Sequence, residues 1–295
     1  MFEAFSTEFH RTEDFHTYPG YFETNNMILY AKAIQLKEKG KLSYSHMQIH
    51  NQIDSHFCGK WWHIDWEART SVPISEFSNY MPYIVKDPAK YIYFQPELRE
   101  LLQTLRAKGK GLFLATNSHY PYANLIMSQT LGEDWKSFFD VICEWCSKPK
   151  FFAEKRPFKV VDIKDSIFEG PECETLEQGK EYLFGNHQVL EQFFKTKLDS
   201  PSLKFLFFGD SLMSDCGASA KLPNWEALAI IEELQDAAPD LPASHKDYMI
   251  KSQSFWGNYF FEITESGPIP TLWMDYARHR CRYALPFMAW IKHLM

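Results

Sequence analysis

Residues 205–215 read Phe-Leu-Phe-Phe-Gly-Asp-Ser-Leu-Met-Ser-Asp, and this stretch decides the fold. The apolar run at its start is typical of a buried strand in a parallel sheet. The polar turn that follows holds two carboxylates, Asp210 and Asp215, five positions apart. Ligands of open α/β sheets bind at the carboxyl ends of the strands. Acidic side chains gathered there repel one another, so the pattern favours a divalent cation between them.

The region around this stretch alternates apolar strands with amphipathic helices, which predicts an α/β fold with a parallel sheet. In chain order we expect a helix from Pro96, a strand over 111–115, a helix over 121–130, a strand over 139–143, a helix over 187–197 and a strand over 225–231. Residues 153–182 are charged and lack a clear period, so they are expected to form a surface insertion.

The two ends of the chain lack this alternation of strands and helices. Residues 1–20 predict an irregular arm, and two helices are expected over 25–39 and around 43–52. From residue 246 the chain is aromatic and basic, and it is expected to end in a helix. That helix would include Trp273, Tyr276, Arg278, Arg280, Arg282 and Trp290.

Composition limits the function classes. With 31 basic and 38 acidic residues the net charge is −7, which argues against electrostatic binding to nucleic acid or anionic lipid. No apolar run reaches membrane-spanning length, and the first 25 residues are too acidic for a transit peptide and not apolar enough for a signal peptide. The aromatic content of 17% fits either a protein contact surface or an aromatic-rich core, and the sequence leaves both open.

Cysteines and histidines give weaker signals. The six cysteines show no framework spacing, which indicates a reducing intracellular compartment, the cytoplasm or the mitochondrion. Cys143 and Cys146 form a lone Cys-x-x-Cys without a second pair, so a zinc or redox role is disfavoured. His46 and His50 lie one helical turn apart, but no acidic residue completes a metal pattern. A solvated helix face is therefore expected there.

Four blocks follow one another at plausible spacings. They are Tyr93–Leu102, Leu112–Ser118, Lys148–Phe152 and Gly209–Asp215. Together they resemble the cytosolic purine 5′-nucleotidase and its nucleotidase-domain-containing relatives, a branch of the haloacid-dehalogenase superfamily. The resemblance covers residues 83–235 well, and it extends weakly to Tyr18–Ile34 and Trp256–Phe261.

The resemblance implies a three-layer Rossmann-like parallel sheet. It also implies a division into an N-terminal arm with a partial helical cap (1–90), a core (91–245) and a helical C-terminal tail (246–295). By the same likeness Thr116 and Asn117 match the phosphate-binding second motif and Lys148 matches the third-motif lysine. Asp210 and Asp215 match the carboxylates of a Mg²⁺ site, and residues 185–186 match the turn before the fourth motif.

One block of the family pattern is missing from this sequence. The family begins with a strand that ends in Asp-x-Asp-x-Thr/Val, whereas this chain begins inside the implied cap. None of the early aspartates (Asp14, Asp54, Asp65 and Asp87) follows an apolar strand or has a second aspartate two positions on. The sequence therefore predicts that no aspartyl-phosphate forms on this chain and that its hold on Mg²⁺ is weakened.

The resemblance places the missing strand mid-sheet, between the strands that end at Thr116 and Gly209. Buried backbone groups left without hydrogen bonds cost roughly 1–3 kcal/mol each. We therefore expect the neighbouring strands to close up, the arm over 1–10 to fill the gap, or another chain to donate a strand.

Three functions remain open on this basis. The first is a nucleotidase-like domain without catalytic activity, which serves as a structural or accessory subunit among other protein subunits. The second is an active Mg²⁺-dependent 5′-nucleotidase whose first motif comes from a partner chain. The third is a module that binds a nucleotide or phosphate through Thr116, Asn117 and Lys148 without hydrolysis. We expect the first.

Overall fold

The computed structural model describes residues 24–61, 64–65, 70–71, 81–161, 170–231, 247, 261–270 and 283–285. The chain forms two compact units, one built from residues 1–57 with 205–292 and the other from 58–204 with 293–295. The expected arm over 1–20 lies outside the described residues. None of the described helices is long and apolar enough to cross a membrane.

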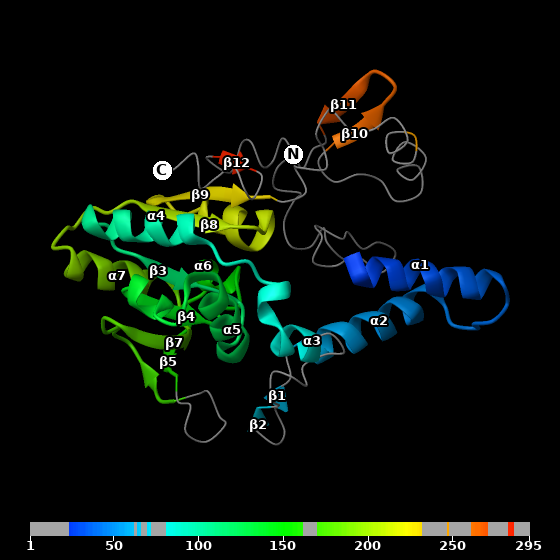
Figure 1. Ribbon diagram of the computed structural model, residues 1–295, viewed down its shortest axis with the longest axis horizontal. Coiled ribbons are helices and arrows are strands. Elements are labelled where there is room, and N and C mark those ends of the chain that lie inside the picture. The colour runs from blue at the N-terminus through cyan, green and yellow to red at the C-terminus, as the bar shows by residue number, and fades with distance from the viewer. Residues whose placement is uncertain are drawn as a thin grey trace. The chain divides into compact units, whose positions relative to one another are not determined.

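A five-stranded sheet forms the centre of the 58–204 unit (Figure 1). In spatial order its strands are β3 (Phe113–Ala115), β4 (Val141–Glu144), β7 (Lys180–Phe184), β5 (Phe158–Val160) and β6 (Glu172–Cys173). The first three are parallel, and β5 and β6 add antiparallel strands at the far edge. The predicted α/β fold with a mainly parallel sheet is therefore confirmed.

Helices cover both faces of this sheet. On one face α4 (Pro96–Ala107) and α5 (Tyr120–Leu131) pack with the short helix η6 (Trp135–Phe138) over Ile142 of β4, which is buried. On the other face α7 (His187–Lys197) sets the ring of Phe194 against Phe113 of β3, with 5.8 Å between centroids. The parallel strands thus lie between two helical layers, as strands buried on both faces require.

Local signals in the sequence account for where these helices begin and end. Pro96 starts α4, where its missing N–H costs nothing. Gly109 ends it with a φ of 72°, and the N–H of Lys110 donates to the carbonyl of Leu105 in the hydrogen bond of a Schellman cap. At the start of α7 the Asn186 side chain accepts a hydrogen bond from the Val189 N–H.

The surface insertion expected over 153–182 is wrong for much of that range. Residues 158–160, 172–173 and 180–184 are strands, and β7 lies inside the sheet beside β4. Its sequence, Lys-Glu-Tyr-Leu-Phe, begins with two charged residues, which hides the strand from an apolarity pattern. Residues 162–169 lie outside the described residues.

The second unit has a three-stranded parallel sheet. Its strands are β12 (Tyr283–Leu285), β9 (Trp225–Ile230) and β8 (Phe205–Gly209), in that order. The rings of Phe205 and Trp225 stack across β8 and β9 with their centroids 4.7 Å apart. The parallel strand predicted at 204–208 is thereby confirmed, but its burial on both faces is wrong, because Leu206 and Phe208 are exposed while Phe205 and Phe207 are buried.

The helical tail is wrong where the structure describes it. Residues 283–285 form β12, which adds to the edge of β9, and Phe261–Thr264 (β10) pairs with Gly267–Pro270 (β11) as an antiparallel hairpin. Pro286 explains part of this result, because the residue before a proline is pushed away from the helical conformation. The other residues of the expected terminal helix lie outside the described part.

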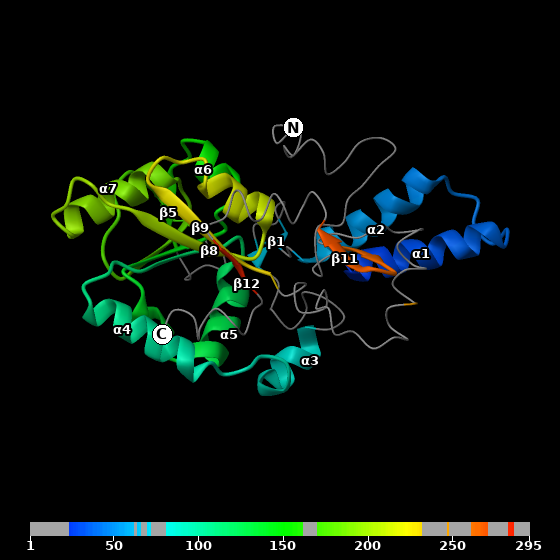
Figure 2. The same cartoon turned by 90° about the horizontal axis from the view of Figure 1, so that it is seen from above.

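Helices α1 (Thr24–Glu38) and α2 (His46–Trp61) form an antiparallel hairpin (Figures 1 and 2). They confirm the two predicted helices, but His50 does not lie on a solvated face. It is buried, and its ring meets Tyr30 of α1 edge-on at 6.3 Å. The remaining described elements are the short hairpin β1 (Ile64–Asp65) and β2 (Thr70–Ser71), α3 (Met81–Lys86), η5 (Pro88–Lys90) and α6 (Lys150–Ala153).

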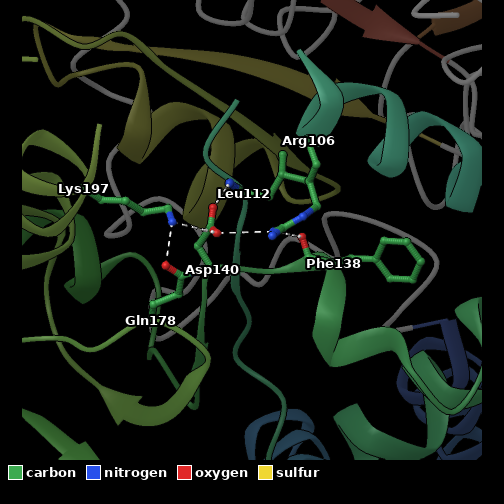
Figure 3. A network of polar contacts seen from close by, with 6 residues as sticks. All are labelled: Arg106, Leu112, Phe138, Asp140, Gln178 and Lys197. Atoms are coloured by element: carbon green, nitrogen blue, oxygen red, sulfur yellow. Dashed lines mark hydrogen bonds and ion pairs between the residues drawn. The ribbon is translucent and has the colours of Figure 1, made fainter. Parts of the chain in front are cut away.

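A buried carboxylate ties the amino-terminal ends of β3 and β4 to helices on both faces (Figure 3). Asp140 accepts hydrogen bonds from the Leu112 N–H at 2.8 Å and from the Arg106 guanidinium of α4 at 3.3 Å. The ammonium of Lys197, at the end of α7, lies 3.3 Å from the same carboxylate. Because buried charges are stable only when paired, these contacts fix both helices on the sheet.

In each sheet one edge is a strand that the family resemblance places beside the missing one: β3 in the five-stranded sheet and β8 in the three-stranded sheet. Among the described residues β3 pairs with β4 alone, and β8 pairs with β9 alone. What completes these edges stays a prediction, because the arm over 1–10 is not described.

Candidate functional site

The loops after β3 and β4 hold three of the predicted site residues. Thr116 and Asn117 directly follow β3, and Lys148 lies four residues beyond β4. Because these two strands are parallel neighbours, their carboxyl ends meet at one edge of the sheet. The structure therefore brings all three residues together, where ligands of such sheets bind.

Asn117 and Lys148 hold each other in place. The Lys148 N–H donates to Oδ1 of Asn117 at 2.7 Å, and Nδ2 of Asn117 donates back to the Lys148 carbonyl at 3.2 Å. The Lys148 ammonium donates to the carbonyl of Ala115, the last residue of β3, at 3.0 Å. The lysine side chain thus crosses from the β4 loop to the end of the neighbouring strand.

Backbone hydrogen bonds join the same two loops. Cys146 donates to the Thr116 carbonyl at 2.9 Å, and Trp145 donates to the Ser118 carbonyl at 3.0 Å. The Ser118 N–H donates to Oγ1 of Thr116 at 3.0 Å. The hydroxyl of Thr116 therefore accepts a bond while its own hydrogen stays available to a ligand oxygen. Together with Lys148, this loop pair presents donors of the kind that bind a phosphoryl group.

Asp210 and Asp215 lie in the other unit, after β8. Asp210 is exposed, whereas Asp215 is buried in a π-helical turn over Leu212–Gly217, and Oδ2 of Asp215 accepts from the Ser211 N–H at 3.4 Å. Gly209 makes this turn possible, because a Cβ on it would lie 2.4 Å from Cβ of Asp215. The glycine before the first aspartate therefore has a packing role of its own.

The aspartate pair supplies only part of a cation site. Within the described part of the chain no three His, Cys, Asp or Glu side chains come together in a group that could hold a metal. Mg²⁺ is often held by one or two carboxylates together with water and substrate phosphate. Two carboxylates that flank a turn fit such a partial site and do not make a complete one.

Glu144 is a functional candidate that sequence reasoning missed. It is the last residue of β4, its side chain is fully buried, and neither carboxylate oxygen has a hydrogen-bond partner. Burial, followed by the nearby charge of Glu181, raises its pKa to about 8, although Lys136 acts in the opposite direction. Glu144 is therefore mainly protonated at neutral pH. The only sequence feature that could have indicated its burial is its position directly after the apolar residues 141–143.

A half-buried ion pair lies next to Glu144. The Lys136 ammonium is 2.6 Å from Oε1 of Glu181 and 4.8 Å from the centre of the Tyr120 ring, at the start of α5. Oε2 of Glu181 is buried and has no hydrogen-bond partner. The carboxyl groups of Glu144 and Glu181 thus share the influence of one lysine, so a second negative charge there would be poorly compensated.

Aromatic rings line the carboxyl ends of β3, β4 and β7. The ring of Trp145 lies 4.2 Å from that of His119 and 4.9 Å from that of Phe184. Trp145, Ser147 and Phe184 have positive φ values of 47°, 55° and 64°, which are rare for residues other than glycine. Such outliers gather at functional sites, where the surrounding structure holds them.

His119 and the Cys-x-x-Cys pair belong to the packing around this edge. Burial lowers the pKa of His119 to about 4, so its ring is neutral at neutral pH. Cys143 and Cys146 are both fully buried, and Sγ of Cys146 lies 3.3 Å from the carbonyl of Cys143. Burial first, then the charges of Cys146 and Glu144, raise the pKa of the Cys143 thiol far above its usual range. An inert thiol of this kind fits packing and argues against a redox role.

The sequence of this chain matches the model of the 5′ nucleotidase family over residues 3–252. The chain belongs to the 5′-nucleotidase family. The match spans both compact units, including the loops at Thr116, Lys148 and Asp210.

Two curated relatives carry names from the same family. The 5′-nucleotidase domain-containing protein 1 of Bos taurus is 30% identical over 200 residues, which cover 62% of this chain and 44% of that protein. The human 5′-nucleotidase domain-containing protein 2 is 37% identical over 155 residues, which cover 52% of this chain and 29% of that protein. The matched part of this 5′-nucleotidase-family chain therefore spans less than half the length of either relative.

Proposed function

We propose that this chain is a 5′-nucleotidase-family domain that binds phosphate between the β3 and β4 loops but does not hydrolyse nucleotides by itself. It would act as an accessory or structural subunit of a larger assembly in a reducing intracellular compartment. The proposed lack of turnover is carried by one observation: no aspartate in the 295 residues is followed two positions later by another aspartate. A covalent nucleophile of the family type is therefore absent from this sequence.

The geometry of the loop pair supports phosphate binding. The two-way hydrogen bonding of Asn117 with Lys148 fixes the loop backbones before any ligand arrives. Preorganised donors bind an anion without a further ordering cost. Asp210 and Asp215, which lie in the other unit, would hold Mg²⁺ weakly, because two carboxylates leave most of its coordination sphere to water.

An exposed aromatic segment supports the accessory role. Within 83–94 the side chains of Tyr83, Tyr91, Tyr93 and Phe94 are 64%, 45%, 73% and 54% exposed. Aromatic residues are enriched where proteins contact each other. Other aromatic residues, such as Trp135 and Phe151, are fully buried, so the abundance of aromatic residues serves both a core and a surface.

The test uses the purified chain with Mg²⁺ and a nucleoside monophosphate. We expect no phosphate release above the blank, while orthophosphate should raise the melting temperature of the protein in a concentration-dependent way. Lys148→Gln should remove most of that stabilisation. Failure of orthophosphate to stabilise the unmodified chain would overturn the binding proposal.

A second function is an active Mg²⁺-dependent nucleotidase whose nucleophile comes from a partner chain. The observation that favours it is that β3 and β8 each pair with one strand among the described residues, which leaves room in each sheet for an added strand. Steady phosphate release by the chain within its assembly, abolished by Asp210→Asn, would establish it and displace the first proposal.

A further inference from the structure

The segment over 148–159 is the most basic part of the described structure near the candidate site. It contains Lys148, Lys150, Lys155, Arg156 and Lys159 against a single acidic residue, Glu154. The whole chain has a net charge of −7, so this basic segment stands against the general trend. A local concentration of positive charge at a strand edge attracts anionic ligands.

The guanidinium of Arg156 is held in place by two neighbouring side chains. Its guanidinium lies 3.7 Å from the centre of the Phe184 ring, and Nη1 donates to Oγ of Ser147 at 3.2 Å. Its backbone carbonyl accepts from Nδ2 of Asn186, the residue that caps α7. A guanidinium stacked on a ring loses little freedom when it forms further hydrogen bonds.

Among the described residues no carboxylate pairs with this guanidinium. Across the residues that the structure describes, Arg156 forms no ion pair, and its single hydrogen bond to Ser147 leaves most of its five N–H donors available. Its side chain is half-buried, which makes its charge more costly than that of a fully solvated arginine. A guanidinium that is fixed in position, forms no ion pair among the described residues and lies where ligands of such sheets bind is well placed to bind an anionic group.

The position of Arg156 relative to Lys148 indicates the class of ligand. Lys148 reaches the end of β3, whereas Arg156 lies on Phe184 at the end of β7, and β4 runs between these strands. Neighbouring strands are about 4.8 Å apart, so the two cationic groups are separated by on the order of 10 Å. One phosphoryl group does not span that distance.

We propose that Arg156 binds a second anionic group of the ligand whose phosphoryl group lies at Lys148. The ligand is then a phosphorylated compound with at least two anionic groups, and a single orthophosphate occupies only the Lys148 end. This inference rests on the proposed phosphate site, and it adds the class of ligand that the site prefers.

The experiment measures the affinity of the full chain for inorganic tripolyphosphate and for orthophosphate by calorimetry at constant ionic strength. A charge-assisted contact is worth roughly 1.5–3 kcal/mol, so Arg156→Gln should weaken tripolyphosphate binding by about tenfold or more. It should leave orthophosphate binding within about twofold, because Arg156 lies away from the Lys148 end. Lys148→Gln should weaken the binding of both.

The matched control is Lys155→Gln. It removes the same charge from the adjacent, exposed position, and it should change tripolyphosphate affinity by less than about twofold. Equal losses in Arg156→Gln and Lys155→Gln would show general electrostatic attraction and overturn the role of Arg156 while leaving the Lys148 site intact. Binding that depends on Arg156 and not on Lys148 would overturn the proposed phosphate site instead. Thermal unfolding of each variant establishes that a lost affinity is not a lost fold.

Discussion

Glu144 is a single buried carboxyl group that makes the stability of the protein depend on pH. Its pKa in the folded protein is about 8, against an ordinary value of 4.5. The folded state therefore binds this proton more tightly than the unfolded chain does. Between those two pH values folding takes up a proton, so the free energy of unfolding falls as the pH rises. Below pH 4.5 and above pH 8 this group adds no further slope.

Glu144→Gln should remove that slope because the amide does not titrate. We expect the variant to be less sensitive to pH between 5 and 8, and to be more stable than the unmodified protein at pH 9 by about 5 kcal/mol. Urea unfolding at several pH values measures both quantities. Parallel stability curves for the two proteins would show that Glu144 is ionised in the folded state.

Asp140 and Asp134 show how burial decides the value of an ion pair. Asp140 is buried with Arg106 and Lys197, whereas Asp134 is more than half exposed and pairs with Arg99. Removing a buried carboxylate leaves the cations around it without their partner, whereas an exposed pair is weakened by solvent and contributes little to stability. We expect Asp140→Ala to lower the free energy of unfolding by several-fold more than Asp134→Ala. Equal losses in the free energy of unfolding, measured by chemical denaturation, would show that Asp140 does not hold the two helices on the sheet.

At the scale of elements, the turn between β7 and α7 depends on a glycine. Gly185 has a φ of 82°, and a Cβ on it would lie 2.0 Å from the Phe158 ring of β5. Gly179 has a similar φ of 75°, but nothing lies within 4 Å of the position where its Cβ would be. An alanine at Gly179 would carry only the backbone cost of a positive φ, whereas an alanine at Gly185 would also clash with the Phe158 ring.

Gly185→Ala should therefore destabilise the protein more than Gly179→Ala. The backbone cost alone is about 1–2 kcal/mol at either position, and overpacking adds about 1–3 kcal/mol at Gly185. Thermal unfolding of both variants provides the measurement. Equal shifts in melting temperature would mean that the Phe158 ring moves aside freely.

The exposed aromatic segment makes the opposite prediction about stability. Tyr91, Tyr93 and Phe94 are largely exposed, so replacing all three with alanine should change the melting temperature little. If the segment contacts a partner, the triple variant should lose its place in the assembly while it keeps its fold. Co-purification from cells, compared with circular dichroism of the isolated chain, tests both statements. A large loss of melting temperature would instead assign the segment to the core.

At the scale of the whole molecule, short sequence patterns predicted the site residues that lie directly after a strand. The loop after 111–115 and the block after 139–143 contain Thr116, Asn117 and Lys148, and parallel pairing of β3 with β4 then brings them together. Strand β7 was missed because its identity depends on pairing with β4, and its own sequence starts with charged residues. Tertiary context overrides a short apolar pattern in such cases.

Residues whose role depends on burial escaped prediction for the same reason. Glu144 differs from a surface glutamate only because the folded chain buries it, and Arg156 is held only because Phe184 and Ser147 lie beside it. Neither relation is visible in sequence spacing. The helical tail was mispredicted because the strand at 283–285 forms against β9, more than fifty residues away along the chain.

The hydrogen bond between Lys148 and Ala115 has a consequence for assembly. Thr116 directs its N–H and carbonyl to the β4 side, so its neighbour Ala115 directs its own carbonyl to the opposite edge of β3. A strand that joined the sheet along that edge would use the same oxygen as an acceptor, and the ammonium of Lys148 already donates to it. A carbonyl oxygen has two lone pairs, so the added strand and Lys148 would share this acceptor, and the edge of β3 is already partly satisfied before any strand arrives.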